Sequence, residues 1–211
     1  KEVILAMFHE DIEAKHQAGW VEKEQRIVAR EMDMLGAIVV ASRDATSIGE
    51  AEAQQAFTEL IRAKGLELLT WTPSAIRFRQ RVQFTSLHQC AELPDWSDKG
   101  LMEGLETWFT PYCGQCRTIN DLRKLNVEEL LRQSMSYAQL SSINRSAPDT
   151  YKPPKGREVF IDYTNPDQPT IAARLQFMFG VRSNPKIANG NVPLTIELLS
   201  PADRPLQKRS E

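Results

Sequence analysis

Apolar residues in the last third of the chain follow the pattern of short β-strands. Val159, Ile161 and Tyr163 alternate with other residues, which is the period of a strand with one buried face. The triplet Asn165-Pro166-Asp167 favours a turn, because proline fixes φ while Asn and Asp tolerate bends. The stretch from 159 to 167 therefore predicts a strand followed by a tight turn.

Two more apolar segments follow this turn. Ile171 to Phe179 predicts a strand that runs into one or two helical turns, and Gly180 fits a helix end that needs a positive φ. Alternating apolar residues from Leu194 to Leu198 predict a third strand, which Ser200-Pro201 would end. We expect these strands to form a small sheet on which the following side chains pack: Leu175, Phe177, Met178 and Phe179.

The first part of the chain predicts a second, antiparallel sheet. Val3 to Phe8 is a short apolar strand, and Arg26 to Arg30 is a strand core preceded by a loop through Ala18-Gly19. Leu35-Gly36 interrupts the pattern, and the continuous apolar run from Ala37 to Ala41 predicts a buried strand.

Helices are predicted next. Ser47 and Glu50 have the capping-box spacing of a helix that Gly65 ends. Thr72-Pro73-Ser74 starts a second helix, because proline is tolerated in the first turn. The apolar side predicted for this second helix contains Ile76, Val82 and Leu87.

The second helix also carries three arginines, Arg77, Arg79 and Arg81, whose spacing spreads them over more than one helix face. Two interpretations stay open. The arginines form either a solvated surface whose stems cover apolar neighbours, or a basic patch that faces RNA or another domain.

A break at Leu93-Pro94-Asp95-Trp96 suggests a domain boundary, with one domain at 1–94 and another at 95–211. Ser97 is a predicted N-cap, Asn126 a cap between two short helices, and Met135 to Ile143 a further helix. The loop from Pro148 to Gly156 leads to the C-terminal sheet. The expected core positions of these helices are Leu101, Leu105, Trp108, Phe109, Ile119, Leu122, Leu125, Val127, Leu130 and Leu131.

Strands and helices do not alternate regularly along the chain, so the sequence predicts an α+β fold. We expect a small, truncated antiparallel β-segment, central helices, and a small C-terminal sheet with packed helices.

Composition indicates a soluble globular protein of 211 residues, with 41% hydrophobic and 26% charged residues. No apolar run is long enough for a bilayer, and no signal-peptide pattern is present. Three cysteines do not suggest a disulfide framework, so we expect a reducing cytoplasm. Because the sequence starts at Lys1 without Met, we expect a piece of a longer protein.

The net charge of −2 argues against a strongly basic nucleic-acid module. The charge is uneven, because residues 145–211 hold 10 Lys/Arg and 7 Asp/Glu whereas residues 1–144 hold 16 and 21. This bias is either an ordinary variation of solvated faces or part of a surface that contacts phosphates.

A metal site is one alternative. His88 and Cys90, together with Cys113 and Cys116, supply the imidazole and thiolate ligands that zinc prefers. The zinc-deaminase signature does not fit, because Cys90 stands where that signature has Glu. The other interpretations are ordinary buried thiols or a redox CxxC pair, the latter without a thioredoxin-like context.

Catalytic signatures are missing from the sequence. His9, His16 and His88 accompany no nucleophile motif, and no GxxxxGK[ST] loop occurs. Asp162 is a lone carboxylate, for which a solvent or salt-bridge role is expected rather than general-base catalysis. The chain therefore predicts no enzyme of its own and no cofactor or metal.

Basic residues next to glycines form the candidate nucleic-acid interface. Glycine lets a ligand approach the backbone, and Lys and Arg neutralise phosphates. The aromatic residues available for stacking on bases are Tyr151, Tyr163 and Phe179. The candidate binding residues are Lys155, Arg157, Arg174, Arg182 and Lys186. The alternative is that Gly156, Gly180 and Gly190 are turn glycines with solvated flanks.

Four segments together resemble the C-terminal region of the HrpB family of bacterial DExH-box RNA helicases. They are Ser97 to Tyr112, Ile161-Asp162-Tyr163, Arg174 to Gly180, and Gly190 to Gln207, in the order found in that family. The resemblance implies that the first sheet is the end of an OB-like barrel. It also implies a parent with two RecA-like motor domains that bind ATP, Mg²⁺ and RNA.

The function expected from this resemblance is that of a non-catalytic accessory region. It would bind or guide single-stranded RNA, or pack on the motor domains of the same polypeptide, with no membrane partner. The alternatives are a structural or protein-interaction module without nucleic-acid contact, and a zinc-binding module.

Overall fold

The computed structural model describes residues 12–45, 47–88 and 92–209. Its contacts divide the chain into two compact units, each made of two stretches of sequence. The N-terminal unit comprises Lys1–Thr70 and Met102–Leu130, and the C-terminal unit comprises Trp71–Leu101 and Leu131–Glu211. These units differ from the domains 1–94 and 95–211 predicted from the sequence. The predicted domain boundary stays a prediction. The predicted strand Val3 to Phe8 lies outside the described residues.

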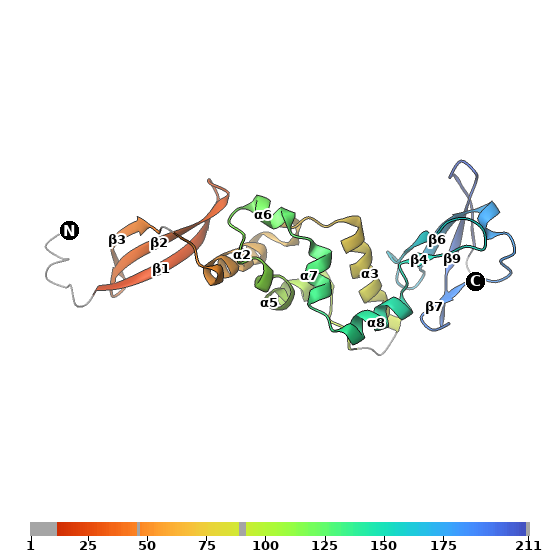
Figure 1. The fold of residues 1–211 in the computed structure, drawn as a ribbon, viewed down its shortest axis with the longest axis horizontal. Coiled ribbons are helices and arrows are strands. Elements are labelled where there is room, and N and C mark those ends of the chain that lie inside the picture. Colours follow the sequence, from red (N-terminus) through yellow and green to blue (C-terminus); the bar gives the residue numbers. More distant parts are fainter. Residues whose placement is uncertain (1–11, 46, 89–91, 210–211) are drawn as a thin grey trace. The chain divides into compact units, whose positions relative to one another are not determined.

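The sheet of the N-terminal unit has three antiparallel strands in the order β1-β2-β3, drawn in red and orange in Figure 1. The loop predicted at Ala18-Gly19 is wrong, because both residues lie inside β1 and pair with Ala29 and Val28 of β2. Gly36, where the sequence predicted an interruption, has a φ of +59° and lies in the turn between β2 and β3. The strands are β1 (Ile12–Val21), β2 (Arg26–Leu35) and β3 (Ile38–Asp44).

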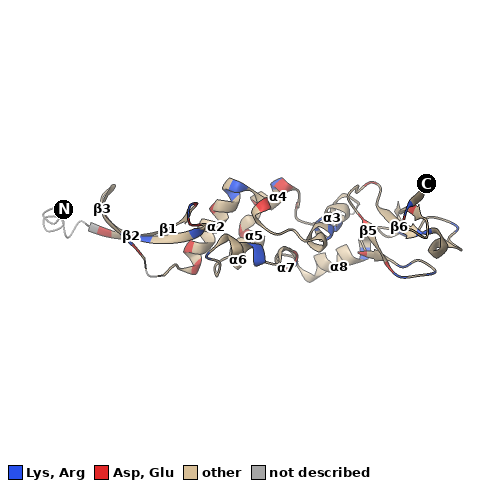
Figure 2. Ribbon diagram, turned by 90° about the horizontal axis from the view of Figure 1, so that it is seen from above, with Lys and Arg blue, Asp and Glu red and all other residues tan. Residues whose placement is uncertain are grey.

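Strand β3 is not buried as its apolar run predicted. The exposed fractions of Ile38 and Val39 are 66% and 49%, and only Val40 is buried. The reason is position, because β3 forms an edge of this sheet. Both charge signs occur along the first sheet and along α2 (Figure 2), and Arg43 pairs with Glu31 across β2 and β3 at 2.6 Å. An edge that mixes apolar and charged residues resists uncontrolled strand pairing.

Helix α2 (Glu50–Lys64) begins later than the Ser47 capping box predicted. Gly49 is the N-cap, and its N–H donates to Glu52 Oε2 at 3.0 Å, so the box is shifted by two residues. Gly65 ends the helix as predicted, with a φ of +98° and its N–H donating to Ile61 O at 2.7 Å. Glycine at this position relieves the strain that any side chain would add.

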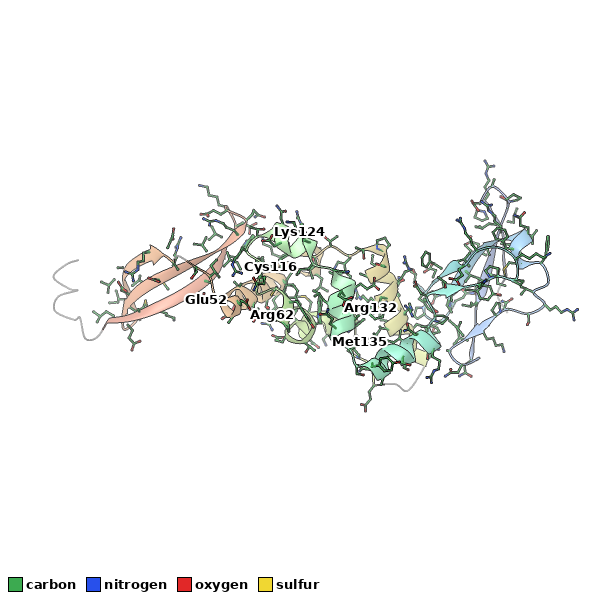
Figure 3. All side chains as sticks on the ribbon, viewed as in Figure 1. Glu52, Arg62, Cys116, Lys124, Arg132 and Met135 are labelled. Carbon is green, nitrogen blue, oxygen red and sulfur yellow. The ribbon has the colours of Figure 1, made fainter. Side chains whose placement is uncertain are left out.

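The helices of the N-terminal unit pack on α2 and hold the sheet through backbone contacts. Thr58 of α2 hydrogen-bonds Thr110 through their hydroxyls at 2.7 Å, and the N–H of Ile27 donates to Arg117 O at 3.0 Å. Arg62 of α2 pairs with Glu106, and Arg62 is labelled in Figure 3. The elements are η2 (Leu66–Leu68), α5 (Leu105–Trp108), η3 (Thr110–Tyr112) and α6 (Ile119–Lys124).

The short helices have the caps predicted at Ser97 and Asn126 and most of the predicted core, and Thr118 is a further cap that was not predicted. Thr118 caps α6 by accepting from Asp121 N at 3.2 Å, and Asn126 Oδ1 accepts from Glu129 N at 3.4 Å at the start of α7 (Val127–Gln133). Ser97 accepts from Gly100 N at the start of α4 (Asp98–Glu103). The predicted core residues of these segments are buried except Leu125: Leu101, Leu105, Trp108, Phe109, Ile119, Leu122, Val127, Leu130 and Leu131.

Helix α3 (Pro73–His88) starts at the predicted proline but buries a different side. The exposed fractions of Ile76 and Leu87 are 43% and 59%, so the predicted apolar side is wrong apart from Val82. The buried stripe also includes two small residues, Ala75 and Thr85, that the predicted apolar side did not contain. Its members are Ala75, Phe78, Val82 and Thr85, at the i, i+3, i+7, i+10 spacing of one helix face.

The arginines of α3 are structural. Arg81 is buried, and its Nε donates to Ala147 O at 2.6 Å while a terminal nitrogen donates to Asn144 Oδ1 at 2.7 Å. Arg79 donates to Trp96 O, and the Arg77 guanidinium lies 4.0 Å from the centroid of the Phe160 ring. Arg79 and Arg81 donate inside the C-terminal unit, and Arg77 covers the Phe160 ring, so these residues fit the prediction of stems that cover apolar neighbours better than that of a basic patch facing RNA.

The sheet of the C-terminal unit has five strands in the order β10-β9-β6-β5-β4. Strands β6 and β9 are parallel, and the other neighbours are antiparallel. The predicted strands and the turn at Asn165-Pro166-Asp167 are present, whereas β10 was not predicted. The elements are α8 (Tyr137–Ser146), β4 (Thr150–Tyr151), β5 (Val159–Asp162), β6 (Thr170–Arg174), η4 (Leu175–Met178), β7 (Lys186–Ile187), β8 (Val192–Pro193), β9 (Thr195–Leu199) and β10 (Pro205–Arg209).

One face of this sheet is the core of the C-terminal unit. Ile161, Ile171 and Ile196 are buried on neighbouring strands together with Phe84 of α3, whereas Asp162 points to the other face. The predicted packing of the η4 segment is only partly right. Met178 is buried and Phe177 half-buried, but Leu175 and Phe179 are 41% and 57% exposed, because a single 3₁₀ turn presents few side chains to the sheet.

The mixed architecture confirms the α+β prediction. The described residues form a three-stranded sheet, helices that follow it in sequence and a C-terminal five-stranded sheet, as expected, together with the two-stranded sheet β7-β8. Whether the first sheet belongs to an OB-like barrel stays a prediction.

Candidate nucleic-acid interface

The five candidate binding residues all lie in the C-terminal unit, but on different elements. Lys155 and Arg157 are exposed in the loop before β5, and Arg174 is half-buried at the end of β6. Arg182 is exposed in the loop after η4, and Lys186 is exposed on β7.

A cavity of about 410 Å³ brings two of them together. Arg157 and Arg174 both line it. Lys155 does not line the cavity, but its backbone N–H donates to the carbonyl of Phe177, which is a lining residue, at 3.2 Å. The remaining lining residues are Val159, Ala172, Ala173, Leu199 and Asp203. Arg182 and Lys186 do not line this cavity.

The loop that carries Lys155 and Arg157 is fixed by the glycine between them. Gly156 has a φ of +103°, and a Cβ at this position would lie 2.7 to 2.9 Å from three atoms of the Phe177 ring. The peptide of Gly156 therefore rests on that ring, at a distance that no side chain permits. This contact and the Lys155 hydrogen bond hold the two cations beside the cavity.

Arg174 is engaged by a carboxylate. Its Nε and one terminal nitrogen each donate to one oxygen of Asp203 at 2.8 Å, the bidentate geometry that guanidinium and carboxylate prefer. These hydrogen bonds lower the pKa of Asp203 and raise that of Arg174, and the positive charge of Arg157 lowers the pKa of Asp203 further. Asp203 adopts a φ of +58° in the turn between β9 and β10, so the pair fixes a turn that its backbone does not favour.

The aromatic residues expected to stack on bases differ in exposure. Tyr163 is buried, and its hydroxyl donates to Pro148 O at 2.7 Å, so the prediction that it is available for stacking is wrong. Burial raises its pKa. Phe179 is exposed and Tyr151 half-buried, and their roles stay predictions. Phe177, which lines the cavity, was not singled out, because the sequence does not show which Phe of the motif faces the basic loop.

The comparisons with known proteins fit this unit and extend beyond it. Residues 108–211 match the family model HrpB_C, described as the C-terminal region of ATP-dependent helicases. The chain is 34% identical over 193 residues to the ATP-dependent RNA helicase HrpB of Escherichia coli K12, covering 89% of this chain and 23% of that protein. The chain belongs to the HrpB family and matches its C-terminal region.

Solved HrpB structures have the same fold. A crystal structure of the E. coli DExH-box NTPase HrpB superposes with a TM-score of 0.76 at 30% identity, covering 98% of this chain and 26% of that one. A second, of the E. coli DEAH/RHA helicase HrpB, gives 0.74 at 30% identity, covering 95% and 26%. The chain thus spans about a quarter of the length of the HrpB proteins that it matches.

Two of the four HrpB-like segments supply half of the residues that line the cavity. Arg174 to Gly180 supplies Arg174 and Phe177, and Gly190 to Gln207 supplies Leu199 and Asp203. Segments that are far apart in the sequence therefore meet where β6 and β9 pair in parallel.

The cysteines of this HrpB-family chain are buried thiols. Cys113 and Cys116 are both free, and the Cys113 thiol lies 3.4 Å from Thr110 O, to which it donates. Burial raises the pKa of Cys113 to about 12 and also raises that of Cys116, so both are protonated at neutral pH. Cys116 is labelled in Figure 3.

The proposed zinc ligands do not gather in the part of the chain that is described. His88 Nε2 lies 2.8 Å from Pro166 O, within hydrogen-bonding distance, and Cys90 lies outside the described residues. Among residues 12–45, 47–88 and 92–209, no group of three or more His, Cys, Asp or Glu could hold a metal ion. Within the same residues, no helix is both long and apolar enough to cross a membrane.

Proposed function

We propose that this chain is the non-catalytic C-terminal accessory region of an ATP-dependent RNA helicase and that it binds and guides single-stranded RNA. The observation that carries this proposal is the 34% identity to the E. coli ATP-dependent RNA helicase HrpB over 89% of the chain. The parent would contribute two motor domains that bind ATP and Mg²⁺. The sequence of this chain has neither a Walker A loop nor a DExH motif.

The charge pattern of the C-terminal unit supports RNA contact. Lys155 and Arg157 are exposed on a fixed loop, and they lie beside a cavity with an aromatic wall. Cations on a rigid loop contact phosphates without a large loss of side-chain and loop freedom. Arg182 and Lys186 would extend the contact along a strand longer than one nucleotide.

Salt-dependent RNA binding tests the proposal. Fluorescence anisotropy of a labelled ten-nucleotide single-stranded RNA is measured with the 211-residue chain at several salt concentrations. We expect binding whose affinity falls linearly with salt on a double-logarithmic plot, with a slope of about −0.7 for each phosphate contacted. Absence of binding at low salt would reject the RNA-binding role.

A second role, packing against the rest of the same polypeptide, is favoured by the exposed apolar residues of β3. Ile38 and Val39 are 66% and 49% exposed at a sheet edge. The double variant Ile38→Ser, Val39→Ser should leave the melting temperature of the 211-residue chain nearly unchanged and lower that of the full-length parent. Equal effects on the two proteins would rule out this packing role.

A further inference from the structure

The cavity between the Lys155–Arg157 loop and β6 has the composition of a site for one nucleotide. Its lining combines an aromatic ring, small aliphatic residues and guanidinium groups. We infer that it is a single-nucleotide subsite, in which a base of single-stranded RNA lies against Phe177 and the neighbouring phosphate pairs with Arg157. This inference rests on the proposed RNA-binding function and names the residues that contact one nucleotide.

The size and floor of the cavity suit a base. About 410 Å³ lies within the range of small-molecule pockets. The floor includes the apolar side chains of Ala172, exposed on the open face of β6, and of Leu199 on β9, which pairs with Arg174. Ala172 and Arg174 share that face of β6, because side chains alternate along a strand.

The aromatic wall is held in place before any ligand binds. Gly156 covers one part of the Phe177 ring, and the Lys155 N–H bonds the Phe177 carbonyl, so neither ring nor backbone has to be ordered by the ligand. A preordered aromatic surface binds more tightly than a mobile one, because less conformational freedom is lost. Phe179, two residues on, is exposed and does not line the cavity.

The two arginines have different parts in this subsite. Arg174 is a positioning residue, because two of its donors bond Asp203 at 2.8 Å. Among the described residues, no hydrogen bond or ion pair engages the Arg157 guanidinium, and that side chain is exposed. Because two Arg174 donors already pair with the Asp203 carboxylate, Arg157 is the cation of the lining that remains able to pair with a phosphate.

A nucleotide accounts for this lining better than an acidic peptide does. An acidic peptide would use the cations but leave the Phe177 ring and the alanine floor without a partner of matching shape. Base stacking uses the ring, and the attached phosphate uses Arg157. The two ligands therefore differ in whether Phe177 contributes to affinity.

The test measures the affinity of the labelled ten-nucleotide RNA and its salt dependence for paired variants of the 211-residue chain. Phe177→Leu should weaken binding at least about five-fold and leave the salt slope unchanged, since stacking releases no counterions. Arg157→Ala should weaken binding and make the slope less steep by about 0.7. The controls Tyr137→Leu and Arg145→Ala lie on exposed positions of α8 and should change neither quantity.

A third variant keeps the test valid if loss of Phe177 disturbs the fold. Ala172→Leu adds bulk to the cavity at an exposed position and should weaken RNA binding without lowering the melting temperature. Phe177→Tyr keeps an aromatic ring at this position and should bind RNA with about the wild-type affinity, unlike Phe177→Leu.

The outcomes separate this inference from the proposed function. RNA binding in which Phe177→Leu and Ala172→Leu behave like Tyr137→Leu would overturn the subsite while leaving the RNA-binding role intact. Displacement of the RNA by polyglutamate as efficiently as by unlabelled RNA would assign the surface to acidic proteins and overturn the subsite. If the wild-type chain binds no RNA, the proposed function fails, and the subsite fails with it.

Discussion

Two basic regions of the C-terminal unit look alike in the sequence and differ in the structure. Helix α3 carries Arg77, Arg79 and Arg81, and the loop before β5 carries Lys155 and Arg157. The α3 arginines bond carbonyls and a carboxylate or lie on aromatic rings, and Arg81 is 5% exposed. The loop cations are exposed. The number of positive charges therefore does not identify a binding surface. What matters is whether neighbouring acceptors have already taken the donors.

Arg132 of α7 extends this contrast. Its guanidinium lies 3.9 Å from the centroid of the Phe78 ring, and Figure 3 labels Arg132 on the part of α7 that follows Leu131. Arg132 therefore covers an aromatic ring of the core, and the α3 arginines also lie over aromatic rings. Such contacts stabilise the fold and leave these cations less available to a ligand.

The largest expected effect is on stability, from Arg81→Leu. This change leaves the buried Ala147 O, and also Asn144 Oδ1, without their donor, so we expect a loss of about 2 to 4 kcal/mol in the free energy of unfolding. Denaturant unfolding followed by circular dichroism measures it. A change below about 0.5 kcal/mol would show that Arg81 is not the structural residue described here.

A smaller effect is expected from glycine substitutions that compare the basic loop with an open turn. Gly156→Ala should lower the free energy of unfolding by about 2 kcal/mol, because it adds both backbone strain and a clash with Phe177. Gly180→Ala has a similar φ of +98° but no atom within 4 Å of the added Cβ, so about 1 kcal/mol is expected. Equal losses for the two variants would contradict the contact between Gly156 and the ring.

The smallest expected effect concerns the Arg174–Asp203 pair. The pair lowers the pKa of Asp203 in the folded protein, so its contribution to stability is present above the pKa of the unfolded chain and is lost as pH falls through the folded value. Arg174→Gln should raise the pKa of Asp203 toward its ordinary value. An NMR titration of the Asp203 carboxyl carbon measures this shift, and an identical pKa in both proteins would mean that the pair does not form in solution.

The sequence predicted local structure best at residues whose type strongly favours one backbone conformation. Pro73, Gly65 and the Asn165-Pro166-Asp167 turn lie where they were expected, because their backbone preferences are strong. Burial was predicted less well. The apolar run at Ile38 lies on a sheet edge, and Ala75 rather than Ile76 belongs to the buried face of α3.

The candidate site shows the same limit. Lys155 and Arg157 were chosen as candidates because Gly156, between them, would let a ligand approach the backbone. Gly156 does allow a close approach, but the group that approaches it is the Phe177 ring. The cavity depends on the parallel pairing of β6 with β9, which joins residues about 25 positions apart and which no local pattern encodes. Sequence patterns therefore indicate which residues can bind, whereas the topology decides which of them meet.

The salt dependence of RNA affinity for the wild-type chain and for the double variant Lys155→Gln, Arg157→Gln tests the account most directly. The double variant should keep the wild-type melting temperature, bind more weakly, and have a salt slope that is less steep by about 1.4, the value for two lost phosphate contacts. An unchanged slope, or a wild-type chain that does not bind RNA at low salt, would contradict the claim that this loop contacts the phosphates of RNA.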